Sequence, residues 1–169
     1  MGKSLRFVSG QQRHKIGVMP VENLCQVVWT RMKFYIASRL ENYVQVRFLS
    51  TKMKTAGWVH TYDWTNEWVQ QGSVKETDKE TLKSIAIKES EGVSNADIVI
   101  VLTPQGRGTH TEFGMAIALN KIVFLCHADN TYFKCDDNAS SFYFHPKVVQ
   151  LVGTTEEIAS ILLKCKHTV

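Results

Sequence analysis

The segment of the chain best suited to chemistry runs from Thr103 to Lys121 and reads TPQGRGTHTEFGMAIALNK. Within it, Glu112 follows a GRG loop and opens a run with helical periodicity, which supports two interpretations. As a structural residue, Glu112 would complete a capping box with Thr109, three positions earlier. As a reactive residue, it would be a carboxylate in the first helical turn, kept ionised by the helix dipole and free N–H groups. An ionised, positioned carboxylate is what covalent glycosyl transfer requires.

A second acid, Glu89, lies on the apolar side of a predicted helix. Counting in helical steps from Leu82 to Val93 places Glu89 on the same stripe. A carboxylate on a core-facing stripe costs free energy unless it is paired or lies at a pocket wall. Glu89 would therefore pair with a basic residue such as Lys88 or Arg107, or have a raised pKa that suits a proton donor.

Two further pairs of residues follow predicted strands. Asp63 and Trp64 end the run HTYDW, where an aromatic ring could stack on a base or simply pack against its neighbours. Ser38 and Arg39 follow the first strand, where they could hold a phosphate or a sugar hydroxyl, unless Ser38 is an ordinary helix N-cap.

Metal and cofactor chemistry finds little support in the sequence. The histidines are not spaced as metal ligands with nearby thiols or carboxylates, and there is no P-loop and no G-x-G-x-x-G after the first strand. The four cysteines are scattered without C-x-x-C spacing. We therefore expect no metal, no cofactor and reduced thiols in a cytoplasmic protein.

The elements that must position these residues alternate along the chain. Five apolar runs are predicted strands: KFYIAS (33–38), WVHTYDW (58–64), ADIVIVLTP (96–104), KIVFLCH (121–127) and KVVQLV (147–152). Helices are predicted between them: one from Arg39 with Leu40, Val44, Phe48 and Met53 on one face and a stop at Gly57, others from Thr77 and Thr109, and a last one from Thr154. Such alternation predicts an α/β fold, a doubly wound five-stranded parallel sheet with helices on both faces. Its ligand crevice would lie beyond the carboxyl ends of the strands, where all the candidates above converge, with His127 beside them.

Composition indicates a globular protein, with 44% hydrophobic and 21% charged residues, and no apolar run long enough to span a membrane. The regular pattern begins at Met32, so we predict a single domain over residues 32–169. Residues 1–31 carry five basic residues and one acid, whereas the rest of the chain is balanced. This basic arm is interpreted as a solvated leader rather than as a nucleic-acid contact.

Several segments together resemble the nucleoside 2-deoxyribosyltransferase family and its relatives that hydrolyse nucleoside monophosphates. They are FYIASRL, GWVHTYDWT, NADIVIVLTPQGRGTHTEFGMAIALNKIVFL and FYFHPKV. The resemblance implies a flavodoxin-like sheet and cleavage of an N-glycosidic bond, with Glu112 as the nucleophile that forms a glycosyl-enzyme ester. It places Glu89 where the family usually has an aspartate, and it matches Ser38 and Arg39 to residues that hold a 5′-phosphate in some relatives. It also implies a homo-oligomer.

The leading hypothesis is an enzyme that acts on a 2′-deoxynucleoside or its monophosphate, with no nucleic-acid or membrane partner. Its predicted catalytic residues are Glu112, Glu89 and Asp63. Its predicted substrate-binding residues are Phe34, Ser38, Arg39, Trp64, Gly106, Arg107, Gly108 and His110. The alternatives are a glycohydrolase acting on a nucleoside monophosphate or a dinucleotide such as NAD, and a non-catalytic nucleotide-binding or sensing domain of the same fold.

Overall fold

The computed structural model describes residues 31–67 and 77–164 of the chain. The leader predicted for residues 1–31 lies outside the described residues except for Arg31, and Cys25 and Cys165 lie outside them as well. Cys126 and Cys135 are free thiols. No helix within the described ranges is both long and apolar enough to cross a membrane.

The described chain alternates strands and helices as the sequence predicts. The strands are β1 (Lys33–Ala37), β2 (Val59–His60), β3 (Ile98–Leu102), β4 (Ile122–His127) and β5 (Val148–Val152). The helices are α1 (Tyr43–Thr55), α3 (Lys79–Asn95), α4 (Arg107–Ala118) and α5 (Thr155–Lys164), with short 3₁₀ turns η2 (Leu40–Asn42) and η4 (Ser141–Phe144).

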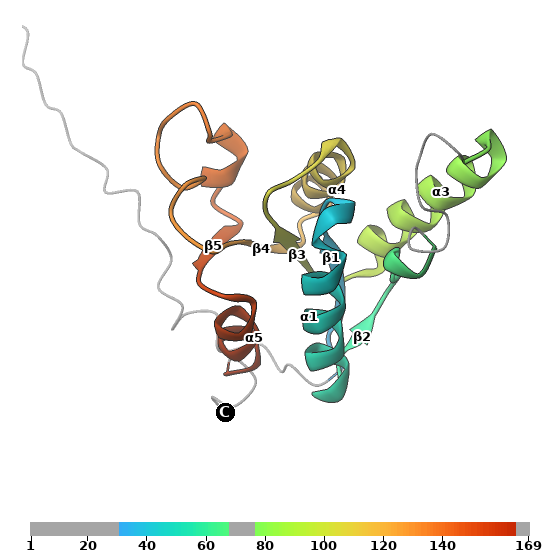
Figure 1. Ribbon diagram of the computed structural model, residues 1–169, viewed down its shortest axis with the longest axis horizontal. Helices are drawn as coiled ribbons and strands as arrows, with labels where there is room; N and C mark the ends of the chain where they lie inside the picture. The colour runs from blue at the N-terminus through green and yellow to red at the C-terminus, as the bar shows by residue number, and fades with distance from the viewer. Residues whose placement is uncertain (1–30, 68–76, 165–169) are drawn as a thin grey trace, which may run out of the picture.

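The five strands form one parallel sheet in the order β2-β1-β3-β4-β5 (Figure 1), which confirms the predicted flavodoxin-like architecture. Every residue of β3, the run IVIVL, is buried, as expected for a central parallel strand covered on both faces. The order changes direction between β1 and β3, and the loops after these two strands therefore meet at the position where such sheets bind ligands.

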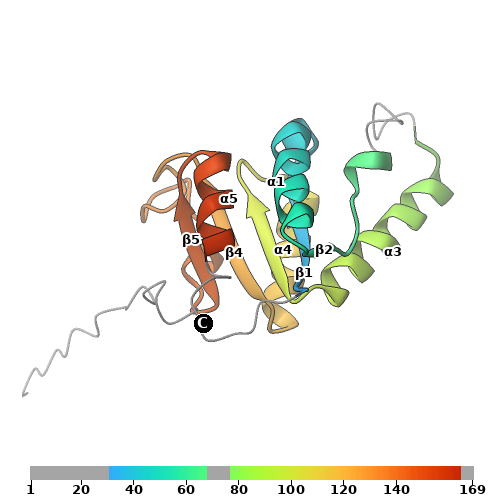
Figure 2. The ribbon, with the colours of Figure 1, turned by 90° about the horizontal axis from the view of Figure 1, so that it is seen from below.

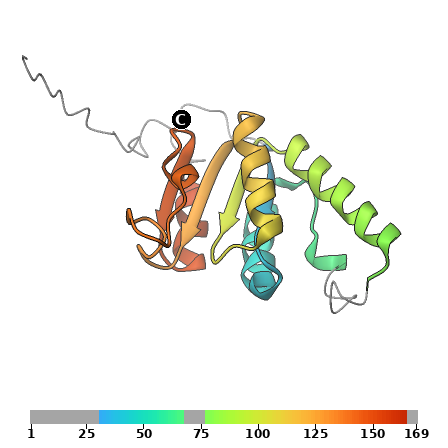
Figure 3. The same cartoon turned by 90° about the horizontal axis from the view of Figure 1, so that it is seen from above.

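Helices cover both faces of the sheet. Helices α1 and α5 pack together on one face (Figure 2), and α3 and α4 pack together on the other (Figure 3). Of the predicted helix starts, the one at Thr154 is confirmed, because Glu157 and Thr154 exchange side-chain to backbone hydrogen bonds of 2.8 and 3.2 Å. At α3 the cap is instead Asp78, which accepts from the Thr81 amide at 2.9 Å.

Two sequence predictions about the β1–β2 half of the sheet are wrong in detail. The predicted strand over residues 58–64 forms only β2, and the chain turns away from β1 after Thr61, whose amide donates to the Phe34 carbonyl at 2.9 Å. The buried face of α1 matches the one counted from Leu40 only in part, since Met53 is buried and Leu40 and Phe48 are partly buried against the core. Its buried residues are Val46, Leu49, Ser50 and Met53, whereas Val44 is 57% exposed. A 3₁₀ turn precedes α1 and winds more tightly than an α-helix, which shifts the helical phase. The predicted stop at Gly57 is confirmed, where φ is 90°.

Candidate active site

A cavity of about 540 Å³ opens where β1 and β3 end. Its walls come from the loop after β1, the corner after β2, the middle of α3 and the first turns of α4. Eight of the eleven predicted site residues line this cavity: Ser38, Arg39, Trp64, Glu89, Gly106, Arg107, Gly108 and Glu112. Phe34, Asp63 and His110 do not.

Glu112 does not cap a helix. Helix α4 begins at Arg107, with Gly106 as its N-cap, so that Glu112 is the sixth helical residue rather than part of the first turn. The side chain of Thr109 serves the helix start instead, because its hydroxyl oxygen accepts from the Gly106 amide at 3.1 Å. The predicted Thr109–Glu112 capping box is therefore wrong, and the Glu112 carboxyl group is left for other contacts.

The Glu112 carboxyl group is held by Tyr35 of β1. The Tyr35 hydroxyl donates a hydrogen bond to Oε1 of Glu112, and both side chains are buried. Burial raises the pKa of Glu112, the Tyr35 hydrogen bond opposes this rise and the charge of Glu89 adds to it, which leaves a net pKa of about 8. Burial thus acts against the ionised state that was expected from the helix N-terminus, because it raises the pKa of Glu112.

Sequence reasoning missed Tyr35. A hydroxyl in an otherwise apolar buried strand was the available signal, since a buried tyrosine usually needs a hydrogen-bond partner. Burial and the neighbouring Glu112 raise the pKa of Tyr35 well above its usual value, so the phenol keeps its proton and acts as a donor.

Glu89 lies on the α3 wall of the same cavity, half-buried, and its charge acts on both Glu112 and Tyr35. The expected partner Lys88 instead binds Glu67, with 2.7 Å between Nζ and Oε1. The structure therefore brings the two glutamates from successive helices to one cavity, in the arrangement the sequence predicted.

Gly92 allows α3 to approach β1 closely, one turn after Glu89. A Cβ atom on Gly92 would lie 2.9 Å from the Tyr35 ring and 2.9 Å from Cβ of Tyr62, closer than such atoms pack. The glycine carbonyl also accepts from Thr61 Oγ1 at 2.7 Å. The absence of a side chain at this position thus fixes the distance between the Tyr35 ring and the helix that carries Glu89.

This geometry agrees with a comparison against protein families. A family model described as Nucleoside 2-deoxyribosyltransferase matches residues 34–157, which include every residue of the cavity. The chain belongs to the nucleoside 2-deoxyribosyltransferase family. It is accordingly a nucleoside deoxyribosyltransferase-like enzyme, from a family that cleaves or transfers N-glycosidic bonds.

Among solved structures, the fold is similar to that of the Clostridium botulinum CMP N-glycosidase BcmB. The TM-score is 0.51 at 15% sequence identity, over 77% of this chain and 96% of the other. A comparison with curated protein sequences finds no match.

In this member of the nucleoside 2-deoxyribosyltransferase family, Asp63 shapes a turn and does not line the cavity. Its Oδ1 accepts from the Thr65 hydroxyl at 2.6 Å and from the Thr65 amide at 3.2 Å. The next residue, Trp64, is 3% exposed and lines the cavity. Its indole Nε1 donates to the Ile36 carbonyl at 2.8 Å, which fixes the ring against β1.

Ser38 and Arg39, matched by resemblance to phosphate-binding residues, both have partners within the chain. The Ser38 hydroxyl donates to the Leu102 carbonyl at 3.0 Å and accepts from the Asn42 amide at 2.9 Å. Arg39 binds Glu41 through Nε and Nη2, each at 2.8 Å. This bidentate contact holds the pKa of Glu41 at about 2, well below its usual range.

The remaining predicted residues have different surroundings. Phe34 is fully buried, and its ring stacks on His60 with 4.6 Å between centroids, which makes it a core residue. His110 stands outside the cavity, where Nδ1 lies 3.2 Å from the Gly106 carbonyl and Nε2 lies 3.1 Å from the Tyr143 hydroxyl. Gly106 and Gly108 line the cavity without left-handed backbone angles, so the backbone conformation does not require glycine at either position.

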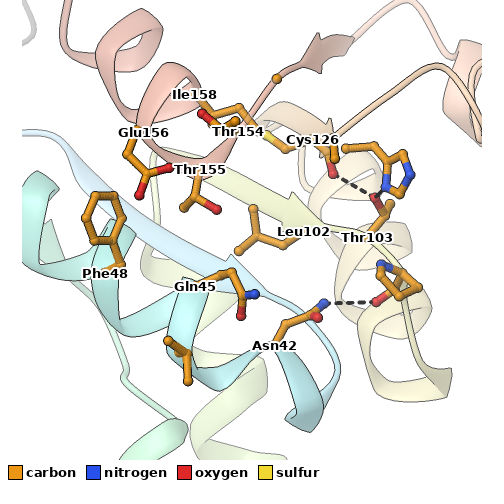
Figure 4. Close-up of a pocket in the computed structure, with 15 residues that line it drawn as sticks. Asn42, Gln45, Phe48, Leu102, Thr103, Cys126, Thr154, Thr155, Glu156 and Ile158 are labelled. Carbon is orange, nitrogen blue, oxygen red and sulfur yellow. Dashed lines mark hydrogen bonds between the residues drawn. The ribbon is translucent and has the colours of Figure 1, made fainter.

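A second cavity of about 570 Å³ lies on the other face of the sheet, between α1 and α5 (Figure 4). Thr103 and His127 line it and are joined by a hydrogen bond between Oγ1 and Nδ1. None of the three glutamates that line the first cavity, Glu41, Glu89 and Glu112, lines the second. Within residues 31–67 and 77–164, no three His, Cys, Asp or Glu side chains are grouped so that they could hold a metal ion.

Proposed function

We propose that the enzyme cleaves the N-glycosidic bond of a 2′-deoxynucleoside or its 5′-monophosphate through a covalent glycosyl ester on Glu112. The observation that supports this proposal is the convergence of Glu112 and Glu89 on one cavity, with Tyr35 holding the first of them. Most enzymes that cleave glycosidic bonds with retention use two carboxyl groups that flank the sugar.

In the first step, an Oε of ionised Glu112 attacks C1′ of the sugar. The C1′–N bond breaks, and its electron pair leaves with the base, which takes a proton from Glu89 acting as the acid. In this scheme the Tyr35 hydroxyl is a positioning group, because it acts on the sugar through the Glu112 carboxyl group that it holds.

In the second step, an acceptor attacks C1′ and the ester bond to Glu112 breaks, which regenerates its carboxylate. With water as the acceptor the products are the free sugar and base, and with a second base the product is a new nucleoside. In either case Glu89 takes the proton that the acceptor loses.

The resting charge state follows from the raised pKa of Glu112. Near neutral pH the buried carboxyl group is largely protonated, since its pKa is about 8. Positive charge that develops on the sugar in the transition state favours the ionised form, as an opposite charge nearby does for any carboxylate. Nucleophile activation is therefore coupled to the presence of the sugar, and the proton that leaves Glu112 passes to Glu89, which then donates it to the departing base.

The test is to incubate the protein with each of the four 2′-deoxynucleosides and their 5′-monophosphates and to follow free base by chromatography. Addition of a second base separates transfer from hydrolysis. Glu112→Gln should reduce turnover by at least about a thousandfold while circular dichroism stays unchanged. A glycosylated protein mass in acid-quenched wild type, absent from Glu112→Gln, would identify the ester.

Saturable binding of these compounds without product would favour the alternative of a sensing domain. Full activity in Glu112→Gln would remove the nucleophile assignment. We also propose that the enzyme is a cytoplasmic homo-oligomer, on the basis of the family resemblance, and light scattering of the purified protein tests the assembly.

A further inference from the structure

One of the arginine side chains that line the active-site cavity is already paired with an acid. Arg39 and Arg107 are the basic residues among those that line the cavity. Arg39 forms an ion pair with Glu41, which lies two residues further along the chain and lines the same cavity. A phosphate that approached Arg39 would therefore meet an occupied guanidinium.

The Arg39–Glu41 contact uses the geometry that a phosphate would use. Nε donates to Oε2 and Nη2 donates to Oε1, each at 2.8 Å, in a parallel two-bond arrangement. Arginine recognises carboxylates and phosphates through this same pair of N–H groups. A 5′-phosphate must displace Glu41 before it can bind the Nε–Nη2 edge of Arg39, because that edge is already used.

Ser38, the other residue of the expected phosphate subsite, is also engaged. Its hydroxyl proton points to the Leu102 carbonyl, and its oxygen accepts from Asn42, whose amide also donates to the Pro104 carbonyl at 3.2 Å. These bonds tie the loop after β1 to the loop after β3. A phosphate that recruited the Ser38 hydroxyl as a donor would break the link between the two loops.

The charge balance around the cavity acts in the same direction. The charges of Glu41 and Glu89 offset those of the two arginines, and Glu112 is largely protonated near neutral pH, so the lining offers a phosphate no net positive charge. A dianionic phosphate at Arg39 would lie within a few ångströms of the displaced Glu41 carboxylate, and like charges at that distance repel appreciably near a protein surface. An uncharged sugar 5′-hydroxyl incurs neither the repulsion nor the displacement.

We infer that Glu41 is a specificity-determining residue that occupies Arg39 and makes the enzyme prefer an uncharged 2′-deoxynucleoside to its 5′-monophosphate. This inference rests on the proposed function, because it concerns which substrate enters the same cavity. Glu41 acts as an internal competitor for the phosphate group and takes no part in bond cleavage.

The experiment compares kcat/KM for each 2′-deoxynucleoside and its 5′-monophosphate in wild type, Glu41→Gln and Glu41→Ala. The ratio of monophosphate to nucleoside should lie below one in wild type and rise about tenfold in both variants, since the repelling charge is removed and Arg39 is released. Glu80→Gln is the matched control, because Glu80 is also an exposed, ion-paired acid, 3.8 Å from Lys83, and does not line the cavity. Its ratio should equal that of wild type.

An unchanged or lower ratio in both Glu41 variants overturns the inference, as does a wild-type ratio above one. Calorimetric titration of Glu112→Gln with 2′-deoxycytidine and 2′-deoxycytidine 5′-monophosphate, with and without Glu41→Gln, gives a readout independent of turnover. Absence of any cleavage in wild type would refute the proposed function, whereas the shift in relative binding would still decide the role of Glu41.

Discussion

The Tyr35 hydroxyl of β1 donates to Oε1 of Glu112 of α4, across the interface between the central sheet and the helix. Both side chains are buried, and the contact joins residues 77 positions apart in the sequence. The bond favours the ionised carboxylate in surroundings that otherwise favour the neutral acid. Because these two effects oppose each other, removing the Tyr35 hydroxyl alone should change the pKa and the reactivity of Glu112.

Replacing Tyr35 with Phe removes the hydroxyl and leaves the ring. Because a hydrogen bond to a charged group contributes about 1.5–3 kcal/mol, the pKa of Glu112 should rise by about one to two units. The rise of kcat/KM with pH should shift by the same amount, with activity near pH 7 reduced at least about tenfold. Tyr43→Phe, on the exposed side of α1, is the control, and an identical pH profile in both variants would contradict the role of Tyr35.

Glu112→Gln should stabilise the protein at alkaline pH. The pKa of this carboxyl group rises from 4.5 to about 8 on folding, so the folded state binds more protons than the unfolded state between those values. Wild-type stability contributed by this group is therefore lost as pH rises from about 5 to about 8. The variant should exceed wild type by about 5 kcal/mol at pH 9 and match it near pH 5 in urea unfolding. An advantage confined to acidic pH would refute the sign of the shift.

The roles of Glu89 and Asp63 can be distinguished by replacing each with its amide. Glu89→Gln should slow release of the base by about a hundredfold or more, because the proton donor is lost. It should also lower the pKa of Glu112, since the repelling charge is removed. Asp63→Asn should cost about 1 kcal/mol of stability through the weakened bond to Thr65, with a small change in kcat. Equal losses of kcat would instead support the catalytic role that the sequence suggested for Asp63.

Gly92→Ala should disturb the site through packing alone. Its Cβ would lie 2.9 Å from the Tyr35 ring, which has no room to move in the core, so the phenol should be displaced from Glu112. We expect a loss of about 1–3 kcal/mol in stability and a clear drop in kcat. In contrast, Gly114→Ala in α4 meets no atom within 4 Å and should stabilise the helix by about 0.5–1 kcal/mol. Similar behaviour of the two variants would argue against the close contact.

The sheet and the convergence of the two glutamates could be predicted from the sequence because both depend on periodicity. The run from Ile98 to Leu102 is apolar throughout, and Glu89 interrupts a helical stripe, so each pattern carries its own signal. The start of α4 could not be placed, because Gly106 and Thr109 are both acceptable caps and only the tertiary contacts choose between them. The partner of Glu112 was equally hidden, because Tyr35 is far away in the sequence.

The role of Asp63 could not be predicted for a different reason. An acid after a strand can project into a crevice or bond to its own turn, and local sequence supports both outcomes. The Thr65 side chain decides between them by offering a hydroxyl at 2.6 Å. Similarly, the pairing of Arg39 with Glu41 depends on the path of a 3₁₀ turn that the helical count did not anticipate.

Strand β1 and the residue just beyond it position several parts of the cavity. Tyr35 sets the position of the acid in α4, the Ile36 carbonyl anchors the Trp64 indole, and Ser38 just beyond the strand fastens the neighbouring loop. A shift of this strand by one residue would misplace all three walls together. Variation in substrate preference within this scaffold should therefore accumulate in the loops that β1 supports, while the strand itself tolerates little change.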